Sequence, residues 1–249
     1  MSEWSWLLAP VTASRRLSVM LIPLGDKVLS RNMVFADLAV AQWAALGSLA
    51  SLTLLPGTLV PGINLTSLGF ALAAIALIHL AMGYTDRYRE PLIGMLYVLG
   101  ASLATLVVSG DPHGARQLAQ TLNGDLLWVS ASQLGPAALL AGLSLIWVRL
   151  GSAIQERLFL VLFALAVTTA VELAGIYVVF ATLIVTPLLV CHLGGKGRRY
   201  AVLVCLSGHL AGLGLSVLLD WPAGPAVVTS VIACGSLSLW TRRKQQSAP

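Results

Sequence analysis

Charged residues are scarce in this chain. They make up 10% of its 249 residues, whereas a soluble domain carries about a quarter. A soluble globule needs a solvated surface, so this scarcity excludes an ordinary soluble enzyme or binding domain. Hydrophobic residues make up 57% of the chain, and its mean hydropathy is +0.87. We therefore expect an all-α, polytopic membrane protein that forms one transmembrane domain over residues 1–249 and has the lipid bilayer as its surroundings.

Several motifs that would indicate disulfides, metal binding or nucleotide binding are missing. The three cysteines, Cys191, Cys205 and Cys234, have no C-x-x-C spacing and lie in or beside apolar runs, so they indicate core residues rather than disulfides or a structural metal site. No G-x-x-x-x-G-K-[ST] phosphate loop, no H-E-x-x-H pair and no cluster of carboxylates occurs. We expect neither an enzyme nor a permanently bound cofactor.

Long apolar runs are what the chain has instead. Because about 20 apolar residues cross the hydrocarbon core, these runs predict eight or nine spans. The clear candidates are Met33–Leu55, Ser67–Met82, Pro91–Val108, Leu126–Leu150, Tyr200–Leu219 and Pro225–Trp240. The run Leu158–Leu193 has 36 residues, too many for one span, and we expect two helices joined by a tight turn near Glu172 and Gly175. One long tilted helix, or a span plus a re-entrant half-helix, is the alternative.

The first segment, Trp4–Leu24, is interrupted by Arg15 and Arg16. Each arginine at the centre of a span costs about 3 kcal/mol on insertion. The segment is therefore expected to be an oblique or partly interfacial helix, with a full span as the alternative.

Basic residues predict which loops face the cytoplasm. If the tail with Arg242, Arg243 and Lys244 is inside, 12 of the 15 basic residues lie in inside loops and only Arg116 lies in an outside loop, with Arg15 and Arg16 undecided. This clustering between apolar runs is not the pattern of a nucleic-acid groove, so we expect no nucleic acid as a partner. The longest outside loop is Ser109–Asp125.

Four stretches of the chain carry recognisable motifs in a fixed order. They are Pro23–Gly47 (PLGDKVLSRNMVFADLAVAQWAALG), Glu90–Ser130, with its LIG-x-x-Y helix, PHG loop and GD-x-LW segment, Ala164–Val190 (ALAVTTAVELAGIYVVFATLIVTPLLV) and, more weakly, Val217–Val227 (VLLDWPAGPAV). In this order they resemble the permease subunits of metal-type ABC importers, which take up zinc or manganese.

The resemblance implies a transmembrane subunit in a bacterial plasma (inner) membrane. It implies a homodimer that forms the path for a divalent transition metal (zinc, manganese or iron). A separate cytoplasmic ATPase would use the ATP, and an extracellular or periplasmic metal-binding protein would deliver the ion.

Two departures from the family's pattern bear on mechanism. Many members carry a Ser-His pair where this chain has Ala41-Gln42, so a metal path through that imidazole would be altered. The loop where the family's ATPase docks is reduced to Arg149–Arg157 (RLGSAIQER). Docking at another inside loop, such as Tyr84–Glu90, or weak coupling would follow.

Polar residues inside spans are the candidates for function, because ionisable groups are costly in a bilayer. For the translocation path we name Asp37, Gln42, Glu172 and His209, with Asp37 and His209 as candidate metal ligands; Asp111 and His113 are candidates in the outer loop. Each also has a plain structural interpretation: Asp37 as a paired or capping group, Glu172 as a wetted group at a fold, His209 as a hydrogen bond between helices, and His113 as a solvated turn residue.

Two other functions stay open on these residues. One is a secondary transporter that uses Asp37 and Glu172 as proton or cation carriers, although no internal repeat is visible. The other is a non-transporting membrane scaffold derived from the permease fold.

Overall fold

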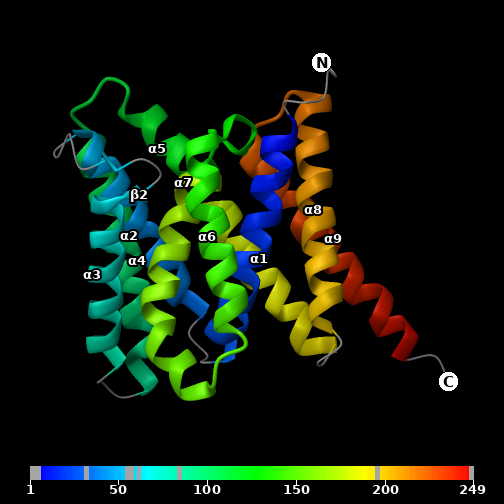
Figure 1. Ribbon diagram of the computed structural model, residues 1–249. Helices are drawn as coiled ribbons and strands as arrows, with labels where there is room; N and C mark the ends of the chain where they lie inside the picture. Colours follow the sequence, from blue (N-terminus) through cyan, green and yellow to red (C-terminus); the bar gives the residue numbers. More distant parts are fainter. Residues whose placement is uncertain are drawn as a thin grey trace.

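The computed structural model describes residues 7–30, 34–53, 59–60, 63–82, 86–193 and 197–246, and these are almost entirely helical. Most helices run between the two ends of a bundle (Figure 1). The elements in chain order are α1 (Leu8–Ser30), α2 (Val34–Thr53), β1 (Leu59–Val60), β2 (Ile63–Asn64), α3 (Leu65–Met82), α4 (Asp86–Val108), α5 (Gly114–Asn123), η2 (Leu126–Trp128), α6 (Ala131–Trp147), α7 (Ser152–Leu193), α8 (Gly197–Leu219) and α9 (Ala223–Gln246).

Four of these helices are long and apolar enough to cross a membrane, judged by length and composition over the described residues. They are Glu90–Val108, Ser152–Leu189, Arg199–Leu219 and Ala223–Trp240. The expectation of an all-α, multi-pass membrane protein is confirmed, whereas the number of eight or nine spans stays a prediction.

Helix α7 is the centre of the bundle. Of its apolar window, 78% is buried, against 22% of that of α4, which lies at the edge. A straight helix of its 42 residues would be about 63 Å long, twice the thickness of the hydrocarbon core. The helix breaks at Gly175, where φ is 77° and ψ is 166°.

The two halves of α7 run in opposite directions (Figure 1). Glu156 in the first half forms an ion pair with Lys27 near the lower end of α1, and Leu183 and Pro187 in the second half pack on Gly25 of the same helix. Both ends of α7 therefore lie near the lower end of the bundle, and Gly175 lies near the upper end. The predicted split into two helices at this point is confirmed.

Helix α1 extends beyond the segment predicted for it. It includes Pro23 and continues past Leu24, through Asp26 and Lys27, to Ser30. It packs on α6, α7 and α8, and its inward-facing residues are fully buried: Ala13, Leu17, Met20, Leu21 and Leu24. Whether it spans the membrane or lies obliquely stays a prediction. The two arginines of α1 differ in their surroundings. Arg15 is exposed, whereas Arg16 donates a hydrogen bond to the carbonyl of Leu134, 2.7 Å away.

Two further boundaries differ from those predicted. The expected outer loop Ser109–Asp125 contains α5, an amphipathic helix whose Leu118 and Leu122 pack on the bundle. Polar residues between these leucines interrupt the apolar sequence, so a search for long apolar runs does not predict α5. The span expected from Leu126 begins as a helix only at Ala131, because η2 and Ser130, which caps α6 together with Gln133, come first.

Candidate functional site

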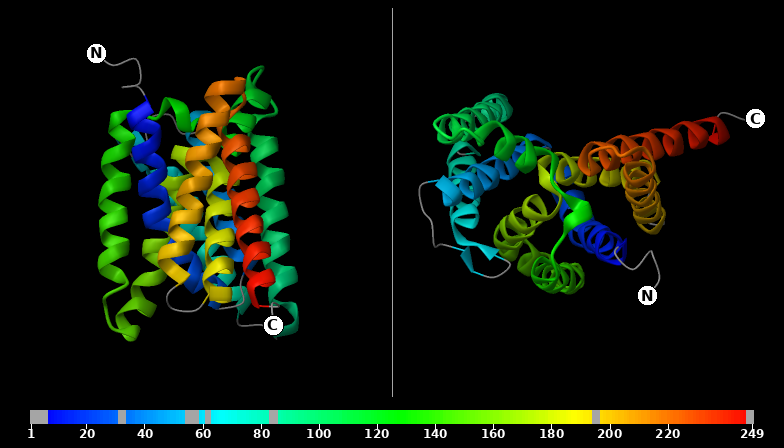
Figure 2. Two further views of the ribbon diagram at one scale, coloured as in Figure 1. Left: turned by 90° about the vertical axis from the view of Figure 1, so that its right-hand side faces the viewer. Right: turned by 90° about the horizontal axis from the view of Figure 1, so that it is seen from above.

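The upper end of the bundle is covered by α5 and η2, which lie across the helix ends (Figure 2). Three glycines bring this cover into backbone contact with the spans. A β-carbon on Gly124 would collide with the backbone of Ala174, one on Gly175 with the backbone of Gly124, and one on Gly224 with the carbonyl of Asn123. Both Gly124 and Gly175 also have positive φ, which residues with a side chain rarely adopt. The cover is thus docked directly on the break in α7.

Glu172 lies one turn before this break. It is half-buried, and its Oε1 atom has no hydrogen-bond partner. A carboxylate oxygen without a partner beneath the cover is available to bind a cation or water. The tight turn proposed at Glu172 and Gly175 is centred on Gly175, and the charge of Glu172 stays on the helix.

The outer candidates Asp111 and His113 lie together just before α5. The Asp111 carboxylate accepts hydrogen bonds from the backbone N–H of His113 at 2.8 Å and from Nε2 of Gln117 at 3.1 Å, and His113 Nδ1 lies 3.6 Å from Asp111 Oδ1. Asp111 therefore holds the first turn of α5. The His113 side chain is 79% exposed and faces solvent at the upper end.

Asp37 lies at the other end of the bundle, in the first turn of α2. It is 1% exposed. Its Oδ1 atom accepts the backbone N–H of Leu38 at 2.8 Å, and its Oδ2 atom has no partner. The basic residue Arg31, six positions earlier in the sequence, lies outside the described residues. The N-terminus of a helix favours a negative charge, which offsets part of the cost of burial.

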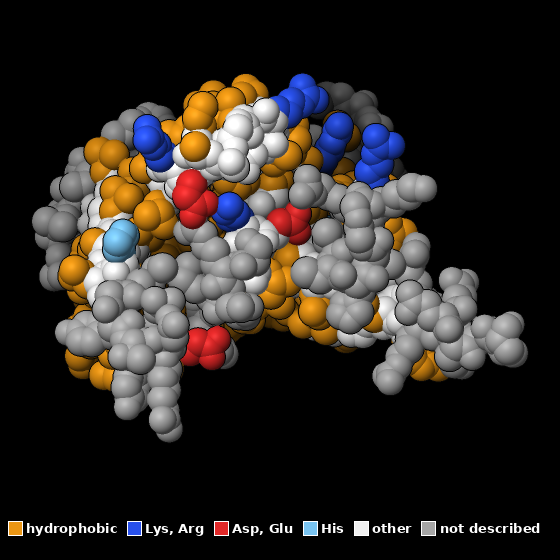
Figure 3. Space-filling model, turned by 90° about the horizontal axis from the view of Figure 1, so that it is seen from below, with side chains coloured by type: hydrophobic (Ala, Val, Ile, Leu, Met, Phe, Trp, Pro, Cys, Tyr) orange, Lys and Arg blue, Asp and Glu red, His pale blue; other side chains and the backbone are white. Residues whose placement is uncertain are grey.

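A pocket of 280 Å³ opens between α1, α2, α3 and α7, close to the start of α2, and Asp37 is not among its lining residues. Ala36 and Val40 of α2 line it, and so do two titratable residues, His79 and Glu156. Glu156 also pairs with Lys27, at 2.9 Å. The face at this lower end carries both basic and acidic side chains among hydrophobic ones (Figure 3).

Gln42 is buried in α2 at 3% exposure, where it packs beside Gly100 of α4. The neighbouring Trp43 donates to the carbonyl of Leu96, at 2.9 Å, and fixes the same contact between α2 and α4. Asp37 and Gln42 are five residues apart, so they point to different sides of α2.

His209 is fully buried in α8 and faces the second half of α7. Its Nε2 atom lies 3.0 Å from the hydroxyl of Thr182, and its Nδ1 atom has no partner. On another face of α8, Gly208 and Gly212 let α9 approach, because β-carbons there would collide with Val231 and Val227. Small residues four positions apart on one helix face allow this close approach of a neighbouring helix.

The four path candidates are not brought together. Among the residues that the structure describes, no hydrogen bond or ion pair joins any two of Asp37, Gln42, Glu172 and His209. Within the described residues, no group of three or more His, Cys, Asp or Glu residues could hold a metal ion. Asp37 and Glu172 instead lie at opposite ends of the bundle.

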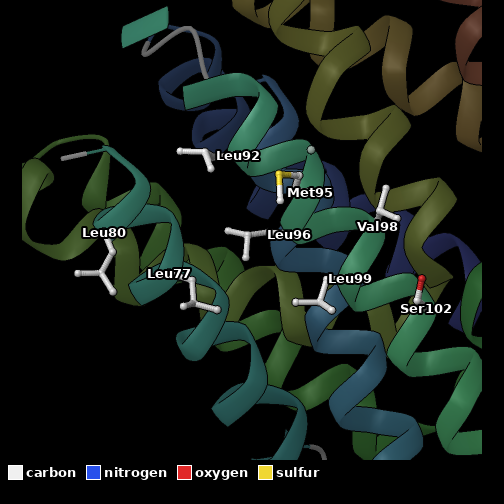
Figure 4. Close-up of a pocket in the computed structure, with 9 residues that line it drawn as sticks. Leu77, Leu80, Leu92, Met95, Leu96, Val98, Leu99 and Ser102 are labelled. Atoms are coloured by element: carbon white, nitrogen blue, oxygen red, sulfur yellow. The ribbon is translucent and has the colours of Figure 1, made fainter. Parts of the chain in front are cut away.

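A second cavity, of 790 Å³, lies between α3 and α4 (Figure 4). Leu77 and Leu80 come from α3, and Leu92, Met95, Leu96, Val98, Leu99 and Ser102 come from α4. Apart from the Ser102 hydroxyl, its side chains are apolar, so it offers few ligands for an ion.

Sequence reasoning missed several buried polar residues. Ser14, Ser18, Thr182 and Thr186 are at most 1% exposed, although each occurs in an apolar helix. Their spacing of four residues along α1 and along α7 is a signal that could have found them, because it places each pair on one helix face.

Comparisons with known proteins bear on the fold. No protein-family model matches the sequence, and no curated protein matches it. The structure is similar to that of PsaBC from Streptococcus pneumoniae, solved in complex with a Fab, with a TM-score of 0.77 and 16% sequence identity over 95% of this chain and 91% of that chain. The chain therefore has the fold of the matched PsaBC chain, and its ordered sequence motifs resemble those of metal-type ABC permeases.

Proposed function

We propose that this chain is the transmembrane subunit of an ABC importer for a divalent transition metal, in a bacterial plasma membrane. The observation that carries the proposal is the match in fold to PsaBC, which extends over 95% of the chain. Four motif regions in the same order along the chain support it independently. The subunit would form the translocation path, and a separate ATPase would drive it.

The polar groups along the bundle support a path for a cation. Glu172 lies beneath the cover at the upper end, and Asp37 lies at the lower end, next in sequence to Ala36, which lines the 280 Å³ pocket. Both have a carboxylate oxygen without a hydrogen-bond partner. Such oxygens are costly inside a bilayer unless they bind something, and a divalent cation would satisfy them.

The two ends of the bundle suit two kinds of partner. At the lower end, the turn between α6 and α7 is ordered by Gln155, whose Nε2 atom donates to the carbonyls of Val148 and Leu150. Ile154, 49% exposed in the first turn of α7, offers a contact for an ATPase on this turn. At the upper end, α5 and the exposed His113 would meet the metal-binding protein. The alternative docking loop Tyr84–Glu90 lies partly outside the described residues.

Co-expression with an ATPase and a metal-binding protein encoded beside this chain tests the proposal. We expect affinity purification of this chain to recover the ATPase in a complex with two copies of each. We also expect cells that lack other importers to take up radiolabelled zinc or manganese only when an intact ATPase is present. Matched cells that carry an ATPase with a mutated phosphate loop are the control.

Uptake that continues with the mutated ATPase would contradict the proposal. It would favour a secondary transporter that uses Asp37 and Glu172. Recovery of this chain alone, without uptake, would favour a membrane scaffold.

A further inference from the structure

Three helices in the interior of the bundle each present a pair of polar residues to the others. In each pair the residues are four positions apart, so both lie on one helix face. All six are at most 1% exposed. They are Ser14 and Ser18 of α1, Thr182 and Thr186 of α7, and Cys205 and His209 of α8.

The pairs meet in two layers. Helix α8 runs upward, whereas α1 and the second half of α7 run downward (Figure 1). Thr182 therefore meets His209, at 3.0 Å, and Ser18 meets Cys205, with 4.0 Å between Oγ and Sγ. The hydroxyls of Thr182 and Thr186 also lie beside the Cys205 thiol. The two layers are about 6 Å apart, the rise of four helical residues.

The hydrogen bonds of Thr182 leave one ring nitrogen of His209 free. The Thr182 hydroxyl donates its proton to the carbonyl of Val178, at 2.8 Å. It can therefore only accept from His209, which places the imidazole proton on Nε2 and a lone pair on Nδ1. This Nδ1 atom is buried without a partner, as is the hydroxyl oxygen of Ser14 in the same layer. A buried polar atom without a partner destabilises the fold, and a bound ligand would satisfy it.

We propose that Cys205 and His209 bind a zinc-class divalent ion, through Sγ and Nδ1. Their spacing, Cys-x-x-x-His on one helix face, is that of the helical pairs that chelate zinc. Sulfur and imidazole nitrogen are ligands that zinc prefers, whereas manganese prefers oxygen. Binding replaces the S–H bond by an S–metal bond, and the thiol proton leaves to water.

The site has only two strong ligands, and this suits an ion in transit. Among the described residues no third His, Cys, Asp or Glu joins the pair, so serine and threonine hydroxyls or water would complete the coordination. A transported ion must be bound weakly enough to leave. The inference rests on the proposed function for its role in transport and deepens it, because it names zinc over manganese as the substrate class.

Metal binding to the purified full-length protein tests the site without transport. Cys191 is replaced by serine throughout, so that Cys205 and Cys234 are the remaining thiols. Titration with Cd²⁺ should produce a thiolate-to-metal charge-transfer band in the near ultraviolet. Zn²⁺ should compete for the site, and Mn²⁺ should not. The band should disappear in Cys205→Ser, whereas Cys234→Ser, which changes a half-buried thiol on α9, should keep it. His209→Gln should weaken Cd²⁺ binding by about tenfold or more, because even outer-shell partners of a metal are worth that much.

A band that survives in Cys205→Ser, or its absence in the parent protein, would overturn the inference. If Cys205→Ser does not fold, as judged by its thermal melt, Cys205→Ala with the same controls gives the decision. The proposed function is tested separately. Normal ATP-dependent uptake by Cys205→Ser would support the importer and exclude the Cys205–His209 site from its transport path. Cd²⁺ binding to the parent protein without uptake of any metal would support the site and contradict the importer.

Discussion

Gly124 and Gly175, both with positive φ, pack backbone to backbone where the outer cover meets the break in α7. This single contact joins the two features that give the upper end its shape, the fold-back of the central helix and the loop after α5. Neither position has room for a β-carbon.

Replacing Gly124 or Gly175 by alanine should therefore destabilise the protein strongly. Backbone strain of about 1–3 kcal/mol adds to the collision at each position. We expect the thermal melting temperature in detergent to fall by roughly 4–12 °C in each variant. Gly110→Ala is the control, because a β-carbon there meets no atom within 4 Å. Equal melting temperatures for all three variants would contradict the contact.

The two neighbouring arginines of α1 should differ in their effect on stability. Arg16 donates to the Leu134 carbonyl, and Arg15 is exposed. A charged hydrogen bond contributes about 1.5–3 kcal/mol, so Arg16→Leu should lower the melting temperature by roughly 3–12 °C. Arg15→Leu should leave it unchanged or raise it. The same melts check both variants, and a larger loss for Arg15→Leu would show that its side chain has a partner that this bundle lacks.

Basic residues predict that the upper end faces outward. In a cysteine-free background, Gln120→Cys on α5 should react in intact cells with a membrane-impermeant maleimide. Ser152→Cys at the start of α7 should react only after lysis. Both positions are exposed in the bundle, so access to the reagent decides the result. The opposite pattern would invert the assigned orientation.

Asp37 should be required for transport and not for folding. Asp37→Asn keeps size and most hydrogen bonding but removes the charge that would attract a cation. We expect metal uptake to fall by about an order of magnitude or more, with membrane expression near that of the parent protein. Glu172→Gln tests the same role at the upper end, and Ser51→Ala, at a buried hydroxyl of α2 that is not a path candidate, is the control. Normal uptake by Asp37→Asn would contradict a role for this residue in the translocation path.

Asp125 should make stability depend on pH. Partial desolvation at the start of η2 raises the pKa of this carboxyl above its ordinary value of 3.8. The folded protein therefore binds this proton more readily than the unfolded one, and stability should fall as pH rises from 3.8 through the raised pKa. Asp125→Asn should flatten that part of the profile. Melting temperatures of both proteins across this pH range measure the effect, and identical profiles would exclude Asp125 as its source.

Hydropathy and charge are properties of local sequence. They predicted the features that depend on them alone, namely the protein class and the break in its longest apolar run. The scarcity of charge predicted a membrane protein. The 36 residues of Leu158–Leu193 predicted a broken helix. A helix that is longer than the thickness of the bilayer must fold back or tilt. The break falls at Gly175 because glycine, unlike the other residues of that run, readily adopts a positive φ.

Helix α5 shows where local reasoning was insufficient. Its apolar residues are too few for a span, and they become significant only because the bundle below provides a surface for Leu118 and Leu122. Helix α1 is a similar case: Arg16 is acceptable within it because the Leu134 carbonyl of another helix lies within reach.

The sequence by itself determined the class of the protein and the residue types available inside the membrane. Tertiary structure decided which of them meet. Cys205 read alone is an inert core thiol, and His209 read alone is a hydrogen bond between helices. Antiparallel packing of α8 against α1 and α7 places both among hydroxyls from distant parts of the chain and leaves Nδ1 of His209 without a partner. Such meetings depend on helix direction and rotation, which are set by packing across the whole bundle and not by any one segment.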